Sequence, residues 1–270
     1  MAKAVRRSRL DAELVRRGLA RSRDQASELI AAGRVKVAGT VATKPATGVG
    51  ADAPILVDTS ETDDPGYASR GAHKLLGALA AFSALTVEGR RCLDAGASTG
   101  GFTDVLLRNG AASVIAVDVG YGQLVWALQT DERVTVMDRT NVRTLTPEAI
   151  GGPVDLVVGD LSFISLTLVL PALISVVRDD GDLVLMVKPQ FEVGKERLGK
   201  GGVVRDPELR ADAVRMVARK VAELGWGIEG VAASPLPGPS GNVEYFLWIR
   251  RTSSPLDETM LRTAIETGPL

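Results

Sequence analysis

Charged residues that could do chemistry stand at the ends of apolar runs in this chain. Lys188 follows the run Leu183–Val187, Asp160 ends the run VDLVVGD, and Glu244 opens the run EYFLW. A lysine in the middle of a buried strand would cost several kcal/mol unless it were paired. The carboxyl edge of an open α/β sheet, in contrast, is where ligands bind. Lys188 is therefore either a solvated strand end or a working group.

A fourth charged group, Lys74, begins a predicted helix in the segment SRGAHKL. The segment SPLPGPSGNVE before the last strand is too short for the helix that a parallel crossover usually needs. We therefore expect that strand to be antiparallel, so that Glu244 starts at the edge where the other strands finish. Lys74, Asp160, Lys188 and Glu244 would then place charges of alternating sign at one rim.

A glycine-rich segment, LDAGASTGGF, lies beside this rim. We expect a strand to end at Asp94 and a helix to start near Gly101, with glycines that let the backbone turn and approach a ligand. A dinucleotide fingerprint would need glycine where Ser98 stands, which disfavours a nicotinamide-dependent enzyme. The residues expected to bind a cofactor here are Asp94, Gly96, Ala97, Ser98, Thr99, Gly100, Gly101 and Phe102.

Two further carboxylates extend this candidate cofactor site. Asp118 ends the predicted strand in SVIAVDVG, where an acidic side chain can accept both ribose hydroxyls of an adenosine. Asp138 ends VTVMDR and could meet the adenine or cap the loop. Together with the glycine turn they fit S-adenosylmethionine, which carries an adenosine but no phosphate. No metal is expected, because Cys92 and His73 are the only residues of their types and cannot form the usual four-ligand zinc site.

The elements that must position these residues alternate from residue 90 onward. Helical patterns at 103–110, 122–130, 163–177 and 207–225 separate predicted strands, which indicates a doubly wound, Rossmann-like α/β domain with an antiparallel last strand. The acidic, aperiodic stretch 59–71 marks a boundary. We therefore expect an N-terminal domain over 1–60, a linker over 61–71 and the α/β domain over 72–270.

The first 50 residues carry 11 basic and 4 acidic side chains, a charge of +7, whereas the remainder carries −8. Two short helical patterns and a small curled sheet are predicted there, and this α+β unit is a candidate RNA-binding module. The alternative is a solvated helix face. The candidate RNA-binding residues are Arg6, Arg7, Arg9, Arg16, Arg17, Arg21, Arg23 and Lys36, with Arg70 from the later SRG segment.

The four rim charges resemble the Lys-Asp-Lys-Glu tetrad of FtsJ-like RNA ribose 2′-O-methyltransferases. The whole chain resembles the TlyA family, in which an S4 RNA-binding domain precedes a class I methyltransferase fold, through the segments SRLDAELVRRGLARSRDQASELIAAGRVKVAG, SRGAHKL, LDAGASTGGFT, DLSFISL, KPQFEVG and PSGNVEYF. Residues 65–68 read PGYA where the family often has R-x-W-V. The resemblance implies S-adenosylmethionine-dependent 2′-O-methylation of cytidine in 16S or 23S ribosomal RNA, with the tetrad as catalytic residues.

The chemistry explains the residue types that the resemblance assigns. A ribose 2′-hydroxyl is a weak nucleophile whose proton must be removed or held, and Lys188, oriented by Asp160 and Glu244, could act as base or as orienting donor. Two alternatives stay open: an RNA-binding ribosome-assembly factor with a vestigial methyltransferase fold, and a membrane-active haemolysin, a name that some family members carry. The single cysteine and the lack of a signal peptide or apolar span favour a cytoplasmic protein whose partners are ribosomal RNA and ribosomal subunits, not membranes.

Overall fold

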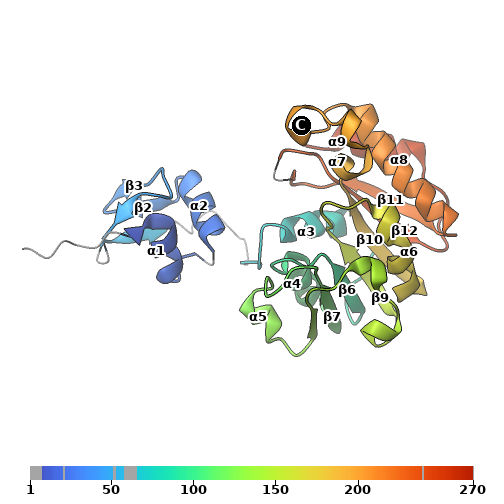
Figure 1. Ribbon diagram of the computed structural model, residues 1–270, viewed down its shortest axis with the longest axis horizontal. Coiled ribbons are helices and arrows are strands. Elements are labelled where there is room, and N and C mark those ends of the chain that lie inside the picture. The colour runs from blue at the N-terminus through green and yellow to red at the C-terminus, as the bar shows by residue number, and fades with distance from the viewer. Residues whose placement is uncertain (1–7, 21, 51–52, 58–65, 239, 270) are drawn as a thin grey trace, which may run out of the picture. The chain divides into compact units, whose positions relative to one another are not determined.

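The computed structural model describes residues 8–20, 22–50, 53–57, 66–238 and 240–269, and the chain divides into two compact units, Met1–Pro65 and Gly66–Leu270 (Figure 1). The division falls inside the stretch expected to be the linker. Within its described residues the first unit contains two helices, as the sequence predicts, and two small sheets where the sequence predicted one. In chain order its elements are β1 (Ser8–Arg9), α1 (Leu10–Arg16), α2 (Arg23–Ala31), β2 (Val35–Val37), β3 (Thr40–Val41), β4 (Gly48–Val49) and β5 (Ile55–Val57).

Apolar spacing explains how the first unit folds. Leu10 and Leu14 on α1 pack with Ala26 and Ile30 on α2 into one buried cluster. Ser22 caps α2, since its side chain accepts a hydrogen bond from the backbone N–H of Gln25 at 3.1 Å. β3, β2 and β5 form an antiparallel sheet, and β1 pairs with β4.

The second unit is built on a seven-stranded sheet with the order β11-β12-β10-β9-β6-β7-β8. Five neighbouring strands of this order, β10, β9, β6, β7 and β8, are parallel. The last strand, β12, is antiparallel to both of its neighbours, as expected. The strands are β6 (Arg91–Ala95), β7 (Ser113–Val117), β8 (Val134–Met137), β9 (Val154–Gly159), β10 (Val177–Val187), β11 (Gly227–Ala233) and β12 (Tyr245–Arg250).

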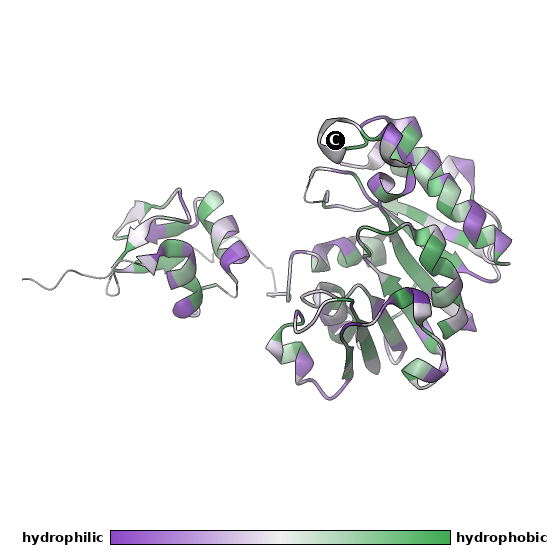
Figure 2. Ribbon diagram, viewed as in Figure 1, coloured by the Kyte–Doolittle hydropathy of each residue, from purple (hydrophilic) through white to green (hydrophobic). Residues whose placement is uncertain are grey.

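Helices cover both faces of this sheet because its strands alternate between two buried clusters. Leu93 and Val157 pack toward α6 and α8, whereas Cys92 and Leu156 pack toward α3 and α4. Figure 2 shows hydrophobic strands between helices whose outer faces, most clearly that of α8, are polar. The helices are α3 (Ala72–Ala81), α4 (Gly101–Arg108), α5 (Trp126–Gln129), α6 (Leu166–Val176), α7 (Pro189–Glu192), α8 (Pro207–Glu223) and α9 (Glu258–Thr267).

Two predicted helices are shorter in the structure than their sequence patterns. The pattern over 122–130 is helical only in α5, because Gly122 has a φ of +64° and Val125 is extended. The pattern over 163–177 becomes α6 only from Leu166, where the side chain of Ser165 accepts a hydrogen bond from the Thr167 backbone N–H. The residues before Ser165 are thereby left as a loop at the carboxyl edge of the sheet.

Candidate active site

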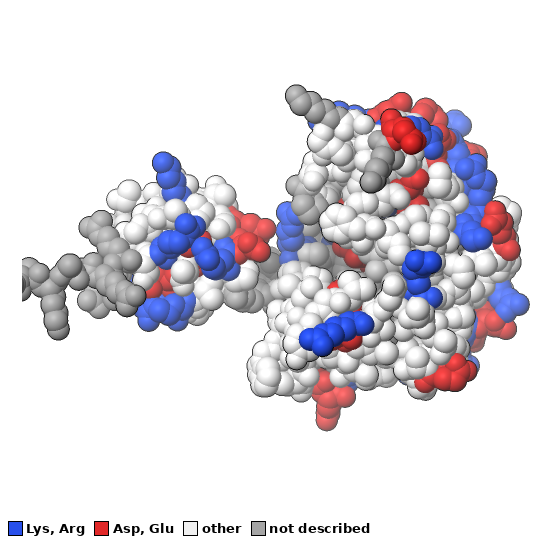
Figure 3. All heavy atoms as spheres, viewed as in Figure 1, with Lys and Arg blue, Asp and Glu red and all other residues white. Residues whose placement is uncertain are grey.

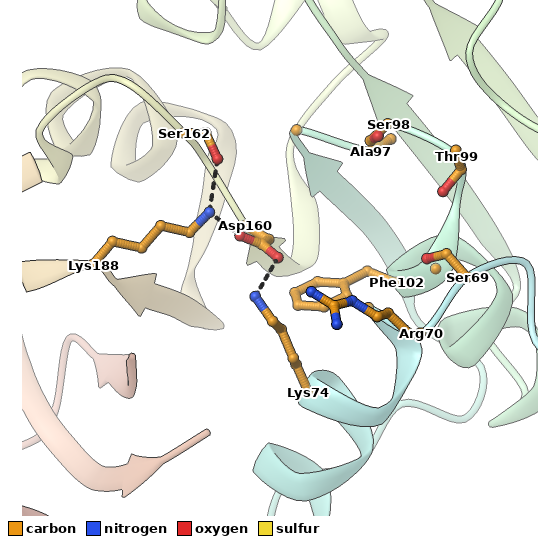
Figure 4. A pocket seen from close by; sticks show the side chains of 13 residues that line it. Ser69, Arg70, Lys74, Ala97, Ser98, Thr99, Phe102, Asp160, Ser162 and Lys188 are labelled. Carbon is orange, nitrogen blue, oxygen red and sulfur yellow. Dashed lines mark hydrogen bonds and ion pairs between the residues drawn. The ribbon is translucent and has the colours of Figure 1, made fainter. Parts of the chain in front are cut away.

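Four charged side chains meet at the carboxyl edge of the sheet in a connected chain of ion pairs. The Lys188 ammonium stands 2.6 Å from Asp160 Oδ1, and Asp160 Oδ2 is 3.4 Å from the Lys74 ammonium (Figure 4). Lys74 also donates to Glu244 Oε2 at 2.6 Å. Two ammonium and two carboxylate groups thus neutralise one another, which is the condition for burying charges at tolerable cost.

Strand pairing explains why these residues converge. The antiparallel pair β10–β12 ends at the register Val187–Tyr245, so Lys188 and Glu244 are the next opposed positions. Asp160 directly follows β9, the parallel neighbour of β10 on its other side. Lys74 reaches the same edge from the first turn of α3. All four residues therefore lie at one rim of the sheet, as the sequence predicts.

The four charged groups differ in how far they are exposed to solvent. Lys74, Lys188 and Glu244 are each buried, with 6%, 6% and 1% of their surface exposed, whereas the side chain of Asp160 is 21% exposed. Lys188 also donates a hydrogen bond to Ser162 Oγ at 2.8 Å, so its directed bond goes to that hydroxyl while Asp160 is an ion-pair contact. An ammonium has three N–H donors, so Lys188 keeps donor capacity for a ligand beyond its bond to Ser162.

A cavity of about 250 Å³ opens onto this group. Asp160, Ser162, Lys74 and Lys188 line one side of it, and Figure 4 shows Arg70, Ser69 and Phe102 on the other. Arg70 itself is exposed at the surface. The cavity therefore combines three of the four charged residues with an exposed arginine that can contact an anionic substrate.

A second and larger cavity of about 450 Å³ shares Gly96 and Ser98 of the glycine-rich loop with the first. Its polar groups include Asp118, Gln123 and Asn141, and its apolar wall is built from Val117, Val119, Val142, Leu161, Phe163 and Ile164. Among the lining residues that the structure describes there is no lysine or arginine. A site that offers carboxylates and no cation suits a neutral or cationic ligand and not a pyrophosphate.

The glycine-rich loop has the backbone that the sequence predicts. Gly96 and Gly100 have φ values of +85° and +98°, and Ser98 also lies in the left-handed region. A Cβ on Gly96 would lie 2.9 Å from the backbone oxygen of Asp160, and one on Gly101 would lie 2.4 Å from the Ser69 hydroxyl. The loop thus packs tightly against both the strand end that carries Asp160 and the segment that carries Arg70.

The carboxylates of the predicted cofactor site have different surroundings. Asp118 Oδ2 accepts from the Ser98 N–H at 2.8 Å and Oδ1 accepts from the Gly120 N–H at 2.7 Å, which fixes the carboxylate at the cavity wall. Asp138 accepts from the Gly122 N–H at 2.8 Å and does not line the cavity; Asn141 and Thr140 of the same loop do. Asp138 therefore holds Gly122 in the loop that follows β7, whereas the sequence considered a contact with adenine or a cap on its own loop.

Asp94 is completely buried and also lies outside both cavity walls. Burial raises its pKa to about 7, opposed by hydrogen bonds from Thr103, whose hydroxyl donates to Oδ2 at 2.7 Å. Its Oδ1 has no hydrogen-bond partner within the part of the chain that the structure describes. Asp94 thus links the end of β6 to α4, because it accepts the hydrogen bond from Thr103 on the helix that follows the loop.

Ser162, Asn141 and Phe163 are site residues that the sequence reasoning missed. Ser162 stands two residues after Asp160, in the segment DLSFISL that the family resemblance had already singled out. Phe163 is 91% exposed with a φ of +63°, and its ring lies 5.3 Å from that of Phe191. A polar or aromatic residue within two or three positions of a predicted strand end was the available signal.

The basic candidates in the first unit fall into three groups. Arg9, Arg16 and Arg23 have side chains that are 52%, 62% and 59% exposed, and Lys36 is exposed. Arg17 is 21% exposed and donates to Ala53 O at 2.7 Å, so it holds the unit together. Arg6, Arg7 and Arg21 lie outside the described residues. Figure 3 shows basic side chains gathered on the visible face of this unit.

Comparison with family models gives two matches that together cover most of the chain. Residues 67–251 match the model described as FtsJ-like methyltransferase, and residues 8–55 match the S4 domain. A Mycobacterium tuberculosis protein named 16S/23S rRNA (cytidine-2′-O)-methyltransferase TlyA is 62% identical, over 98% of this chain and all of that protein. Hemolysin A of Brachyspira hyodysenteriae is 36% identical over 88% of this chain and 97% of that protein.

The fold has solved relatives. A structure of a Streptococcus thermophilus protein that carries the name hemolysin superposes with a TM-score of 0.76 at 37% identity, over 97% of this chain and 96% of that one. Among the described residues no helix is both long and apolar enough to cross a membrane, and no cluster of three or more His, Cys, Asp or Glu side chains could hold a metal.

Proposed function

Because this chain belongs to the TlyA family of FtsJ-like methyltransferases, we propose that it methylates the 2′-hydroxyl of cytidine in ribosomal RNA, with S-adenosylmethionine as methyl donor. The substrate would be 16S ribosomal RNA, 23S ribosomal RNA or both, as the name of the M. tuberculosis relative states for that protein. The S4 domain would bind the RNA, and the ribosomal substrate would place the protein in the cytoplasm.

The observation that carries this proposal is the junction of the two cavities. Gly96, Ser98, Asp160 and Ser162 line both of them. A methyl donor in the larger cavity and a ribose in the smaller one would therefore meet beside Asp160. The Lys188 ammonium is held at that same point by Asp160 and Ser162, ready to contact the oxygen that accepts the methyl group.

The larger cavity fits S-adenosylmethionine. Asp118 can accept hydrogen bonds from the ribose hydroxyls because each carboxylate oxygen has a lone pair beyond the backbone bond that fixes it. The apolar wall can cover an adenine, and the absence of basic side chains from the described lining matches a ligand with a sulfonium and no phosphate. When bound, this cofactor supplies an electrophilic methyl group.

The tetrad supplies orientation and a path for the proton. S-adenosylmethionine would supply the methyl group, whose bond to sulfur would break as its bond to the 2′-oxygen forms. The Lys188–Asp160 pair would take the hydroxyl proton, on the Asp160 carboxylate while Lys188 is an ammonium that orients the oxygen. Lys74 contacts Asp160 from the other side, with its Nζ 3.4 Å from Oδ2, and Glu244 in turn holds Lys74 at 2.6 Å. Fixing the reactants in line is worth up to about 7–11 kcal/mol of the barrier, so this positioning is expected to provide much of the rate.

The test is transfer of labelled methyl to ribosomal subunits that lack the modification, followed by digestion of the RNA to nucleosides. Wild type is compared with Lys188→Ala and with the matched control Lys220→Ala, which removes a partly exposed lysine on α8 that forms an ion pair with Glu223. We expect label in 2′-O-methylcytidine for wild type and Lys220→Ala, and none for Lys188→Ala.

The methyl-transfer result, together with binding and lysis assays on the same variants, separates the competing functions. No transfer to any subunit or ribosomal RNA, despite binding of both cofactor and RNA, would indicate the ribosome-assembly factor instead. Some relatives carry the name hemolysin. Lysis of red cells that rises with the concentration of pure protein, and that persists in Lys188→Ala, would point to that activity.

A further inference from the structure

A buried carboxylate in the N-terminal unit, Asp11, contacts two of its exposed arginines. Asp11 is 3% exposed although it belongs to a segment in which basic residues dominate. It directly follows Leu10, the first residue of α1, whose side chain is fully buried in the core of the unit. A carboxylate in such a place would oppose the binding of a polyanion unless it had a role of its own.

Two arginines from different elements converge on this carboxylate. Arg9, on β1, donates from Nε to Asp11 Oδ1 at 3.0 Å and from Nη2 to Oδ2 at 2.9 Å. Arg23, at the start of α2, donates from Nη2 to Oδ2 at 2.9 Å. The backbone N–H of Ala12 donates to Oδ1 at 2.8 Å. Chiefly through the hydrogen bond from Arg9, these contacts hold the pKa of Asp11 well below its usual range.

The exposed parts of these two arginines remain available for a ligand. The side chains of Arg9 and Arg23 are 52% and 59% exposed, and each guanidinium has five N–H donors, of which Arg9 uses two and Arg23 one on Asp11. The neighbouring carboxylate Glu13 is different. It binds one exposed arginine, Arg16, and it also binds Arg17, which donates to the backbone oxygens of Ala53 and Gly50 and so stabilises the unit itself.

We infer that Asp11 is a positioning residue for RNA binding, which holds Arg9 and Arg23 side by side as a fixed pair of phosphate-binding guanidiniums. Arginine presents a planar fork that matches phosphate oxygens, but its long side chain loses conformational freedom when it binds. A carboxylate that fixes two forks beforehand removes part of that entropic cost. The inference rests on the proposed RNA substrate, and it names the phosphates of the RNA backbone as the groups that Arg9 and Arg23 bind.

The positioning role predicts a change in RNA affinity opposite in sign to the change expected from net charge alone. Asp11→Asn removes a negative charge from a basic surface, so long-range electrostatics alone would strengthen RNA binding. Loss of positioning would weaken it, on the order of tenfold if two arginine side chains must then be ordered on binding. The matched control is Glu28→Gln, which removes one negative charge from an exposed position on the neighbouring helix α2.

The experiment measures binding of the full-length chain to transcribed ribosomal RNA across a series of salt concentrations. We expect Asp11→Asn to bind about tenfold more weakly than wild type, and Glu28→Gln to bind equally well or more tightly. Asp11→Asn is also introduced into a variant that already carries Arg9→Gln and Arg23→Gln, and this cycle tests for simple misfolding. There Asp11→Asn should have no further effect, whereas a general structural defect would weaken binding in both backgrounds.

The outcomes separate this inference from the proposed function. If wild type binds the RNA and Asp11→Asn binds as tightly as Glu28→Gln, the positioning role is overturned and the methyltransferase proposal stands. An equal loss in both backgrounds of the cycle also overturns it. If wild type neither binds nor methylates ribosomal RNA, the proposed function fails, and the role of Asp11 in RNA binding fails with it.

Discussion

Substitution of the buried carboxylate of Asp94 should change how the stability of the protein depends on pH. Asp94 is fully buried, and burial raises its pKa from an ordinary value of 3.8 to about 7. The folded state therefore keeps a proton that the unfolded state releases above about pH 4. Stability from this residue is lost as pH rises from about 4 to about 7 and is constant above that range.

The magnitude follows from the two pKa values. With 1.36 kcal/mol per pKa unit, the cost of Asp94 is about 1.5 kcal/mol at pH 5 and about 4 kcal/mol at pH 8. The variant Asp94→Asn carries no titrating group, and its amide oxygen can still accept the hydrogen bond from Thr103. Its amide N–H groups add a cost that does not vary with pH, so the slope and not the absolute stability reports on Asp94.

The assay is thermal unfolding of wild type and Asp94→Asn from pH 5 to pH 8, without cofactor. Between these limits wild type should lose about 2.5 kcal/mol more than the variant, or roughly 5–10 °C of melting temperature for a unit of this size. Other titrating groups, such as Glu192, whose pKa is also raised by burial, are present in both proteins and cancel. Parallel curves for the two proteins would refute the raised pKa.

Three further outcomes follow from the structure. Glu244→Ala should lower the unfolding free energy by about 3–5 kcal/mol in a denaturant titration, because it leaves the buried Lys74 ammonium with only a 3.4 Å carboxylate contact. Asp118→Ala should weaken cofactor binding more than tenfold by calorimetry and leave RNA binding unchanged, since it lies in the larger cavity. Gly100→Ala should destabilise the fold more than Gly122→Ala does, because both glycines have positive φ but only the added Cβ of Gly100 meets a side chain, at 2.3 Å; melting temperatures would show this.

Convergence of the tetrad was predictable because it depends only on strand direction and register. A strand that ends in Asp160, one that ends in Lys188 and an antiparallel strand that begins at Glu244 must bring these residues to one edge. The glycine loop was predictable for a similar reason, since its conformation needs residues that tolerate positive φ.

Side-chain partners that depend on loop conformation were beyond sequence reasoning. Asp138 could have faced the larger cavity, but its loop turns so that the carboxylate accepts from Gly122. Arg17 has the same charge as its exposed neighbours, and only the position of Ala53 O shows that it is a structural residue. In each case a bond of about 3 Å depends on backbone segments far apart in sequence.

The structure ranks the four charged residues that the sequence could only group. Glu244 is the most buried of the four, it accepts hydrogen bonds from Lys74 and Gln190, and it does not line the cavity, so we expect its effect on the reaction to pass through Lys74. Asp160 is the most exposed, contacts both lysines and lines both cavities. Loss of Asp160 would therefore remove a carboxylate contact from both ammonium groups, whereas loss of Glu244 removes one from Lys74 alone. The two carboxylates, equivalent by charge and by strand position, are expected to differ in their roles for this reason.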